Sequence, residues 1–327
     1  MKRKKLKGGS LAGTYIIQNE ESNKKYVRKE ISNKHNREYG FQRWYSQLKR
    51  LQRFSLMFPG HFPVVEEYGY ENEMAYFDMP FLESYKNCFD VVKKSKSELE
   101  INNIFNLIIE KLSVMHSRTF KSSKNAMQLY VQEEIMNKIQ DALKNNRFAR
   151  FYEYDKIVLN GNVYTSLSKN IEKYIQFGTK NYKFNLESYT HGNVTLENIM
   201  YSELNNDVIF IDPYEENIID NKYNEYSQLL QSCHGLYEIL NNSIPEVSNN
   251  TISVEHKNTF GLIFFNELFW KYLKSNLTNK EINIVRFFEA SQFIRMLPFK
   301  MEADDSKMIL FYGIASMLVD DLLTSDG

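Results

Sequence analysis

The segment Ser188–Met200 reads SYTHGNVTLENIM, and the segment Phe210–Asn217, a few residues further on, reads FIDPYEEN. The runs ENIMY and DVIFIDP predict two short apolar strands joined by the polar turn SELNN. Asn198 lies in a tight polar loop that enters the first strand, and Asp212 ends the apolar run VIFI. A buried strand would hold the Asp212 carboxylate at a cleft rather than in bulk solvent.

These side chains suit phosphoryl transfer from a nucleotide. That reaction needs positioned phosphates, metal ligands and a group that orients the attacking nucleophile. Mg²⁺ prefers oxygen ligands and keeps several waters, so one amide oxygen and one carboxylate, together with phosphates, suit it. Asn198 and Asp212 supply these two oxygens, and Asn193 lies five residues before Asn198, where a base is expected.

HGNVTLEN followed by FIDP resembles the aminoglycoside phosphotransferase and choline kinase family. The loop of that family reads His-Gly-Asp, four residues and Asn, and Ile-Asp follows; His191, Gly192, Asn198 and Asp212 match this pattern. The resemblance implies an α+β, protein-kinase-like bilobal fold, with a small sheet-rich lobe over residues 1–81 and a larger, mostly helical lobe over 82–327. It also implies transfer of the ATP γ-phosphate to a small hydroxyl compound, with Asn198 and Asp212 as magnesium ligands.

The N-terminal region favours strands, because GTYIIQN and KKYVRKEIS carry strand-like patterns around the turn EESN. GGSLAGTYII resembles the hairpin that covers the phosphates in this family, where glycines let the backbone approach them. The resemblance places Gly8, Gly9 and Gly13 in that role. The connector that hydrogen-bonds adenine resembles YFDMPFL, which contains Met79.

The cation that pairs with phosphate falls on Arg28 or Lys29 by the same resemblance. The two are neighbours in KKYVRKE, and a one-residue step turns a side chain to the other face of a strand. The apolar pattern does not decide between them, and we favour Lys29. Its partner would be an acid on the following helix, where Glu38 is the first candidate. That helix is amphipathic, with apolar residues at spacings of three and four in the run FQRWYSQLKRLQRF.

Asn193 departs from the family pattern, which has Asp at this position. An amide has no basic site at neutral pH, so Asn193 cannot take a proton from the acceptor hydroxyl. The catalytic candidates are therefore Asn193 and its neighbour His191. We expect His191 to brace the loop by hydrogen bonding rather than to act as an acid or base.

The remaining chain, from about Tyr85, is mostly helical. Its clearest patterns are EINNIFNLIIEKLSVMHS, YNEYSQLLQSCHGLYEIL, NTFGLIFFNELFWKYLKSN, KEINIVRFFEASQFIRML and SKMILFYGIASMLVDDLL. Pro298 is expected to end the fourth of these helices. These patterns follow strand-rich sequence and complete the α+β prediction.

The overall composition excludes several classes of protein. The 327 residues contain 41 Lys plus Arg and 41 Asp plus Glu, so no global field recruits nucleic acid. The absence of a long apolar run argues against a membrane protein, and the basic start MKRKKLK, expected to be a solvated tail, is followed by no signal-like segment. Cys88 and Cys233 are too few for a disulfide framework, which favours the cytoplasm.

The sequence thus predicts an ATP- and Mg²⁺-dependent phosphotransferase that acts on a small hydroxylated molecule, such as a sugar or an amino alcohol. The alternative is a catalytically inactive pseudokinase that binds a nucleotide, a metabolite or a protein. A second alternative is an interaction domain that has lost nucleotide binding. The first two hypotheses differ in turnover, which Asn193 affects, and the last two differ in whether Mg-ATP raises the melting temperature.

Overall fold

The computed structural model describes residues 2–6, 12–20, 23–32, 39–71, 73–214, 217–301 and 305–325. The chain divides into two compact units. Unit 1 comprises residues 1–91, 106–115 and 191–217, and unit 2 comprises residues 92–105, 116–190 and 218–327. The segments HGNVTLEN and FIDP therefore belong to the same unit as the N-terminal strands. The lobe boundary expected at residue 81 remains a prediction.

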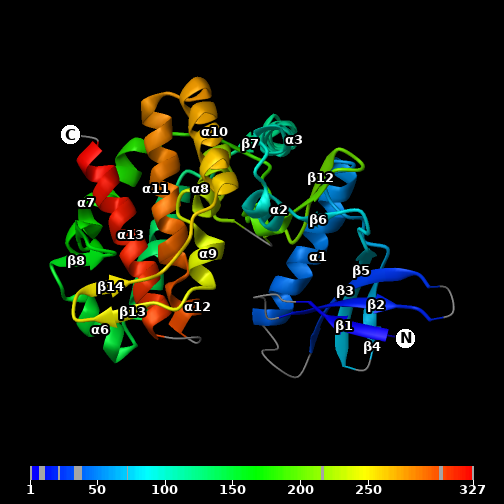
Figure 1. Ribbon diagram of the computed structural model, residues 1–327, viewed down its shortest axis with the longest axis horizontal. Helices are drawn as coiled ribbons and strands as arrows, with labels where there is room; N and C mark the ends of the chain where they lie inside the picture. Colours follow the sequence, from blue (N-terminus) through cyan, green and yellow to red (C-terminus); the bar gives the residue numbers. More distant parts are fainter. Residues whose placement is uncertain are drawn as a thin grey trace. The chain divides into compact units, whose positions relative to one another are not determined.

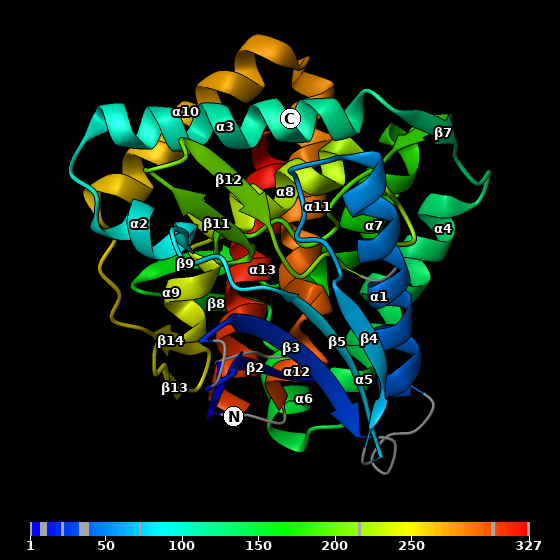
Figure 2. The same ribbon diagram turned by 90° about the vertical axis from the view of Figure 1, so that its right-hand side faces the viewer.

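Unit 1 contains an antiparallel five-stranded sheet with α1 (Tyr39–Met57) beside it (Figure 2). In spatial order its strands are β1 (Lys2–Lys5), β2 (Gly13–Gln18), β3 (Lys25–Ser32), β5 (Met74–Pro80) and β4 (Glu67–Glu71). The helix packs on the sheet through aromatic side chains, since the rings of Trp44 and Phe77 lie 5.7 Å apart. Burial of the stripe Trp44, Leu48 and Leu51 confirms the amphipathic pattern of this helix.

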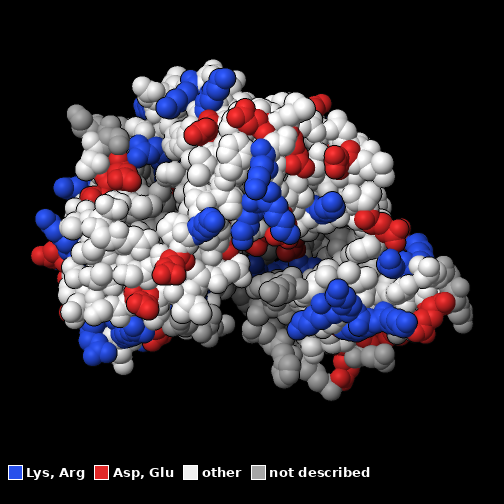
Figure 3. Space-filling view, viewed as in Figure 1, with Lys and Arg blue, Asp and Glu red and all other residues white. Residues whose placement is uncertain are grey.

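The basic start of the chain is an edge strand and not a solvated tail. Residues Lys2–Lys5 pair with β2, and all four are exposed to solvent. Four consecutive cations lack the apolar alternation by which a strand is predicted, while charged side chains on an edge are a common protection against unwanted pairing. Figure 3 shows basic side chains gathered over the strands of unit 1.

A second sheet of unit 1 carries the segments that contain Asn198 and Asp212. It has the order β12 (Asp207–Phe210), β11 (Ile199–Ser202) and β6 (Lys86–Asn87), and a short 3₁₀ turn, η2 (Leu196–Asn198), leads into β11. The hairpin β11–β12 confirms the two apolar strands expected from ENIMY and DVIFIDP. Its register pairs Ile199 with Phe210.

Unit 2 is mostly helical (Figure 1). Its core centres on α11 (Asn279–Arg295), which packs against α8 (Lys222–Cys233) and α13 (Asp305–Ser325). The other helices are α4 (Ala126–Tyr130), the π-helical turn η1 (Val131–Met136), α5 (Asn137–Ala142), α6 (Asn146–Tyr152), α7 (Leu167–Asn181), α9 (Tyr237–Asn241), α10 (Phe260–Asn276) and α12 (Leu297–Met301). Two helices, α2 (Cys88–Lys94) and α3 (Glu98–His116), contribute residues to both units.

Two small sheets complete unit 2. One pairs β10 (Leu186–Ser188) with β7 (Thr119–Lys121), and the other has the order β13 (Glu246–Ser248), β14 (Thr251–Ser253), β8 (Lys156–Leu159) and β9 (Asn162–Thr165). The α+β prediction, with a sheet-rich N-terminal part followed by helices, is confirmed. No described helix is both long enough and apolar enough to cross a membrane.

Pro298 does not act as a simple stop. The helix α11 ends at Arg295, and Pro298 is the second residue of the next short helix, α12. Proline is tolerated in the first turn of a helix, because the backbone N–H that it lacks has no partner within the helix there. Pro298 therefore lies just after the break between the two helices.

Replacing Gly261 by alanine is expected to lower the thermal stability of the protein. A Cβ atom at this position of α10 would lie 1.8 Å from the carbonyl oxygen of Val92. Alanine favours a helix over glycine by about 1 kcal/mol, but overpacking costs about 1–3 kcal/mol. Because backbone and not a flexible side chain opposes the new methyl group, we expect a net loss, to be measured as a lower Tm by calorimetry.

The control is Ser275→Ala, on the exposed face of the same helix. It should leave Tm unchanged or raise it slightly, since alanine is the better helix former. A Gly261→Ala protein as stable as the Ser275→Ala protein would contradict a close approach between α10 and Val92.

Candidate functional site

The hairpin β11–β12 explains how residues far apart in HGNVTLEN and FIDP come together. Ile199 and Phe210 are paired at its open end, so Asn198 and Ile211 face each other one step beyond. The backbone N–H of Ile211 donates to the carbonyl of Asn198 at 2.9 Å. Asp212 follows directly and adopts the left-handed conformation, with φ of 57°. Asn198 and the turn at Asp212 are thereby held at one end of the hairpin.

His191 connects the loop before η2 to the strand before Asp212. Its Nε2 hydrogen bonds the carbonyl of Ile211 at 2.9 Å, and its Nδ1 accepts from the backbone N–H of Asn193 at 3.1 Å. The ring is fully buried and stacks on Phe62, with centroids 5.9 Å apart. Both nitrogens are therefore engaged within the protein, which is the geometry expected of a residue that braces the loop.

Gly192 permits the sharp turn of this loop. Its φ of 81° lies in the region that residues with a side chain rarely adopt, and a Cβ atom would lie 2.2 Å from Nδ2 of Asn217. The carbonyl of His191 also accepts from the backbone N–H of Tyr214 at 3.0 Å. The loop and the turn after Asp212 are consequently packed against each other through backbone atoms.

Asn193 is held in the loop by hydrogen bonds to its backbone. Its N–H donates to His191, and its carbonyl accepts from Nδ2 of Asn198 at 2.8 Å. Within the described segments, nothing hydrogen-bonds the side-chain amide of Asn193, which is partly exposed. The described hydrogen bonds that hold Asn193 in this loop therefore use its backbone.

Asn198 offers one oxygen toward a ligand. Its Nδ2 donates to the carbonyl of Asn193 and to Oγ1 of Thr195, at 2.8 and 3.2 Å. These bonds fix the orientation of the amide and leave Oδ1 without a hydrogen-bond partner in the part of the chain that the structure describes. An oriented amide oxygen of this kind suits a hard cation.

Lys29 contacts Asp212 directly. Its ammonium pairs with Oδ1 of the Asp212 carboxylate; the lysine side chain is 6% exposed and the aspartate side chain 40% exposed. Trp44 of α1 donates from Nε1 to the backbone carbonyl of Lys29 at 3.3 Å, which ties the strand to the helix at this point. The sheet, the helix and the turn of Asp212 thus meet at one ion pair.

Arg28 points to the other face of the sheet. It forms a bidentate ion pair with Asp78, at 2.8 and 2.7 Å, and lies over the ring of Tyr76. The structure thus distinguishes Lys29 from Arg28, which the sequence pattern does not. Lys29 reaches the candidate metal ligand and Arg28 does not.

Gln47 also belongs to this cluster, although it lies outside the sequence motifs. It lies on the buried face of α1 and donates from Nε2 to Oδ1 of Asp212 at 2.7 Å and to the carbonyl of Pro213 at 2.8 Å. A polar residue between the buried apolar positions Trp44 and Leu48 is a signal that the sequence did carry.

The charge of Asp212 is stabilised by its neighbours. Burial alone would raise the pKa of its carboxyl, but the ammonium of Lys29 and the amide of Gln47 outweigh burial and lower that pKa below its ordinary value. The carboxylate is therefore ionised at neutral pH. Its contribution to stability is present above the ordinary pKa of an aspartate and is lost as the pH falls through the lowered value.

The oxygen atoms present fit a magnesium ion. Lys29 and Gln47 both contact Oδ1 of Asp212, so Oδ2 remains for a ligand, as does Oδ1 of Asn198. Among the described residues no group of three or more His, Cys, Asp and Glu side chains is placed to hold a metal. Two protein oxygens with waters and phosphates completing the shell is the usual arrangement for Mg²⁺.

The other site residues predicted from the sequence are less informative. Met79 lies in β5 opposite Val27, and Gly13 begins β2, where a Cβ atom would lie 2.6 Å from the ring of Tyr15. In the β1–β2 hairpin, the N–H of Leu6 donates a hydrogen bond to the carbonyl of Thr14. Gly8, Gly9 and Glu38 lie outside the described residues, and all these roles stay predictions.

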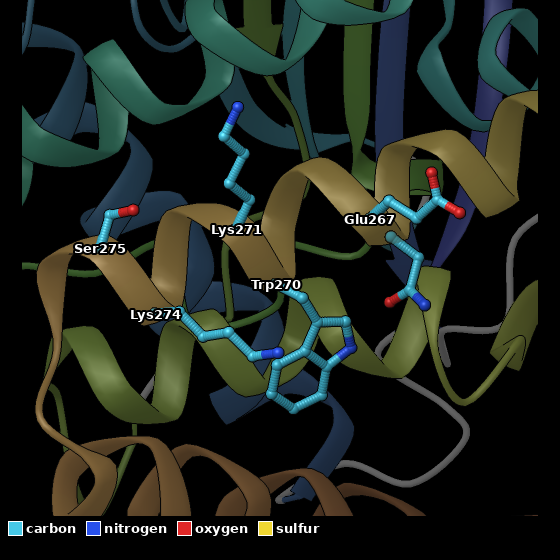
Figure 4. Close-up of a pocket in the computed structure, with 6 residues that line it drawn as sticks. Glu267, Trp270, Lys271, Lys274 and Ser275 are labelled. Carbon is cyan, nitrogen blue, oxygen red and sulfur yellow. The ribbon is translucent and has the colours of Figure 1, made fainter.

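A surface hollow in unit 2 is a poorer candidate. All the residues that line it come from the single helix α10: Asn266, Glu267, Trp270, Lys271, Lys274 and Ser275. Lys271 and Ser275 project from one side of the helix and Trp270 and Lys274 from the other (Figure 4). Ligand sites usually have polar groups that converge on a concave surface, which this stripe lacks.

Comparison with known proteins identifies the fold. No protein-family model and no curated protein matches the sequence. The GDP complex of wild-type aminoglycoside 2'-phosphotransferase-IIIa superposes with a TM-score of 0.60 at 12% identity, over 100% of this chain and 94% of that chain. A single-residue variant of that enzyme, also with GDP, gives 0.61 at 11% identity, over 99% and 92%.

A protein assigned as a fructosamine-3-kinase, from Haemophilus somnus 129PT, gives a TM-score of 0.57 at 10% identity, over 97% of this chain and 91% of that chain. Identities this low show a shared fold and do not transfer an activity. The chain therefore has the protein-kinase-like fold of the aminoglycoside phosphotransferases, as the segments HGNVTLEN and FIDP predict.

Proposed function

We propose that this protein binds a magnesium–nucleoside triphosphate and transfers its γ-phosphoryl group to a small hydroxylated molecule, at a rate limited by Asn193. The observation that carries the proposal is the meeting of three groups in unit 1. The register of β11–β12 holds Asn198 beside the turn of Asp212, and Lys29 contacts that same aspartate. Two oxygens for a cation thus lie with an ammonium that can bind phosphate.

Each residue has a defined task in this proposal. Lys29 holds the phosphates of the donor, while Asn198 and Asp212 hold the magnesium ion through their free oxygens. The metal, when bound, neutralises charge on the phosphates. His191 fixes the loop so that residue 193 faces the acceptor, and the β1–β2 hairpin, with Gly13 at the start of β2, covers the phosphates. A GDP complex is known for the similar aminoglycoside 2'-phosphotransferase-IIIa, which supports a nucleotide as the donor.

A second candidate function is nucleotide binding without turnover. Asn193 favours it, because an amide cannot accept the proton of the acceptor hydroxyl. General-base assistance is worth about 10²–10⁴-fold in rate. Phosphoryl transfer depends mainly on positioning and on charge neutralisation, so a slow reaction does not require the base. The two candidates share the donor site and differ in the chemical step.

Nucleotide binding is tested first. ATP or GTP with Mg²⁺, present at about 100 times its Kd, should stabilise the folded protein by roughly 2.7 kcal/mol. The rise in Tm should shrink when EDTA removes the metal, because neither of the two oxygens assigned to the metal would then contribute to nucleotide binding. Thermal melts that no nucleotide shifts, with or without Mg²⁺, would contradict the donor site.

The metal ligands differ in charge, and their variants should differ accordingly. Asp212→Ala should abolish the magnesium dependence of nucleotide binding, whereas Asn198→Ala should weaken it less, because an amide oxygen is neutral. Calorimetric titrations with and without Mg²⁺ measure both. Asp90→Ala, which removes an exposed carboxylate from α2, is the matched control and should bind as the unaltered protein does. An Asp212→Ala protein that retains its magnesium dependence would refute the assignment.

Asn193→Asp should raise the rate on the true acceptor by about 10²-fold or more. The backbone of the loop is held by bonds that do not involve this side chain, so nucleotide affinity should change little. Steady-state phosphotransfer over a panel of sugars and amino alcohols compares the two forms. Turnover by the Asn193 form at about 1–100 s⁻¹, an ordinary kinase rate, would contradict the claim that Asn193 limits the rate.

A further inference from the structure

The side chain of Gln47 makes two hydrogen bonds that both end on the turn of Asp212. Nε2 donates to Oδ1 of Asp212 at 2.7 Å and to the carbonyl oxygen of Pro213 at 2.8 Å. Both partners accept hydrogen bonds, so only the NH₂ end of the amide fits here, and its two protons satisfy one acceptor each. The orientation of this amide is therefore fixed by chemistry.

These contacts hold a backbone conformation that an aspartate rarely adopts. Asp212 has a φ of 57°, and it is followed by Pro213, whose own N–H is absent. Left-handed residues other than glycine persist where the surroundings fix them. Gln47 supplies such a fixation, because it binds the side chain of Asp212 and the carbonyl of the next residue at once.

The chemical character of α1 makes this amide unusual. The helix Tyr39–Met57 contains no Asp or Glu, so no carboxylate from within it pairs with Lys29. In the described segments the ammonium of Lys29 is instead paired with Asp212, the same group that Gln47 holds. Gln47 is 8% exposed, and it reaches this cluster from the buried face that also carries Trp44 and Leu48.

We propose that Gln47 is a positioning residue for the metal ligand Asp212. This inference rests on the proposed function, since it concerns how Asp212 meets the magnesium ion. Gln47 holds Oδ1 so that Oδ2 faces the ligand, and it continues to hold Oδ1 when Lys29 turns from Asp212 to the phosphates. The carboxylate thus keeps its orientation while its ionic partner changes.

The proposal requires a donor at position 47 and excludes an acid. Glutamate has nearly the same shape, but its carboxylate would face two acceptors, Oδ1 of Asp212 and the carbonyl of Pro213, and would compete for Lys29. Methionine has the same length and is unbranched, yet it offers neither a donor nor a charge. Gln47→Met therefore removes the two bonds, and Gln47→Glu replaces them by repulsion.

The experiment is a calorimetric titration of ATP into each variant, with Mg²⁺ and with EDTA. Partners that orient a metal ligand are typically worth about 10- to 100-fold in metal affinity. We expect Gln47→Met to lose about that factor of the Mg²⁺-dependent affinity and to keep the metal-free affinity. Gln47→Glu should lose more. In the Asp212→Ala background Gln47→Met should have no further effect, because Gln47 acts through Asp212.

The control is Gln42→Met, an equivalent change on the exposed face of the same helix, which should bind as the unaltered protein does. Melting curves without ligand identify variants that fold, and Gln47→Glu carries the test if Gln47→Met does not fold. Equal losses with and without Mg²⁺, or a Gln47→Met protein with full magnesium dependence, would overturn the positioning role and leave the proposed function intact. An unaltered protein that binds no Mg–ATP would overturn both.

Discussion

The imidazole of His191 bonds both segments of the candidate site. It bonds the carbonyl of Ile211 through one nitrogen and accepts from the N–H of Asn193 through the other. Only a neutral ring with its proton on Nε2 can do both, since an imidazolium has no acceptor. The ring is buried against Phe62 and Phe210. The placement of the loop beside Asp212 therefore depends on keeping this histidine uncharged.

The ion pair of Lys29 and Asp212 beside that loop brings together the positive and the negative charge that the proposed magnesium–phosphate ligand would meet. Without a ligand, Lys29 and Asp212 compensate each other, and the surrounding Gln47 and Asn198 are neutral. A phosphate alone would draw Lys29 away and leave the carboxylate uncompensated, which is unfavourable in a partly buried place. Under the proposed function, a magnesium–phosphate complex would replace both partners together, with the cation at Asp212 and the phosphate at Lys29.

Sequence patterns predicted the hairpin β11–β12, and three other features could not be predicted for physical reasons. The strand KYVRKEIS has apolar residues on both faces, so only packing against Trp44 of α1 reveals that Lys29 and not Arg28 faces Asp212. Gln47 was missed because its partner is distant in sequence and because one polar residue barely disturbs a helical stripe. Strand β1 was missed because pairing with β2, rather than any apolar pattern of its own, makes it a strand.

The loop that carries Asn193 is held by bonds to its backbone, which bears on the amide found at this position. The loop is held by the N–H and carbonyl of Asn193, by Gly192 and by His191, and none of these interactions uses the side chain of residue 193. We therefore expect a carboxylate of nearly equal shape to be accommodated at this position with little effect on the fold. At 10–12% identity to phosphotransferases of known structure, the fold has persisted while most side chains have changed. The described hydrogen bonds of this loop are therefore compatible with either residue at position 193, and the proposed difference between the two lies in the chemical step.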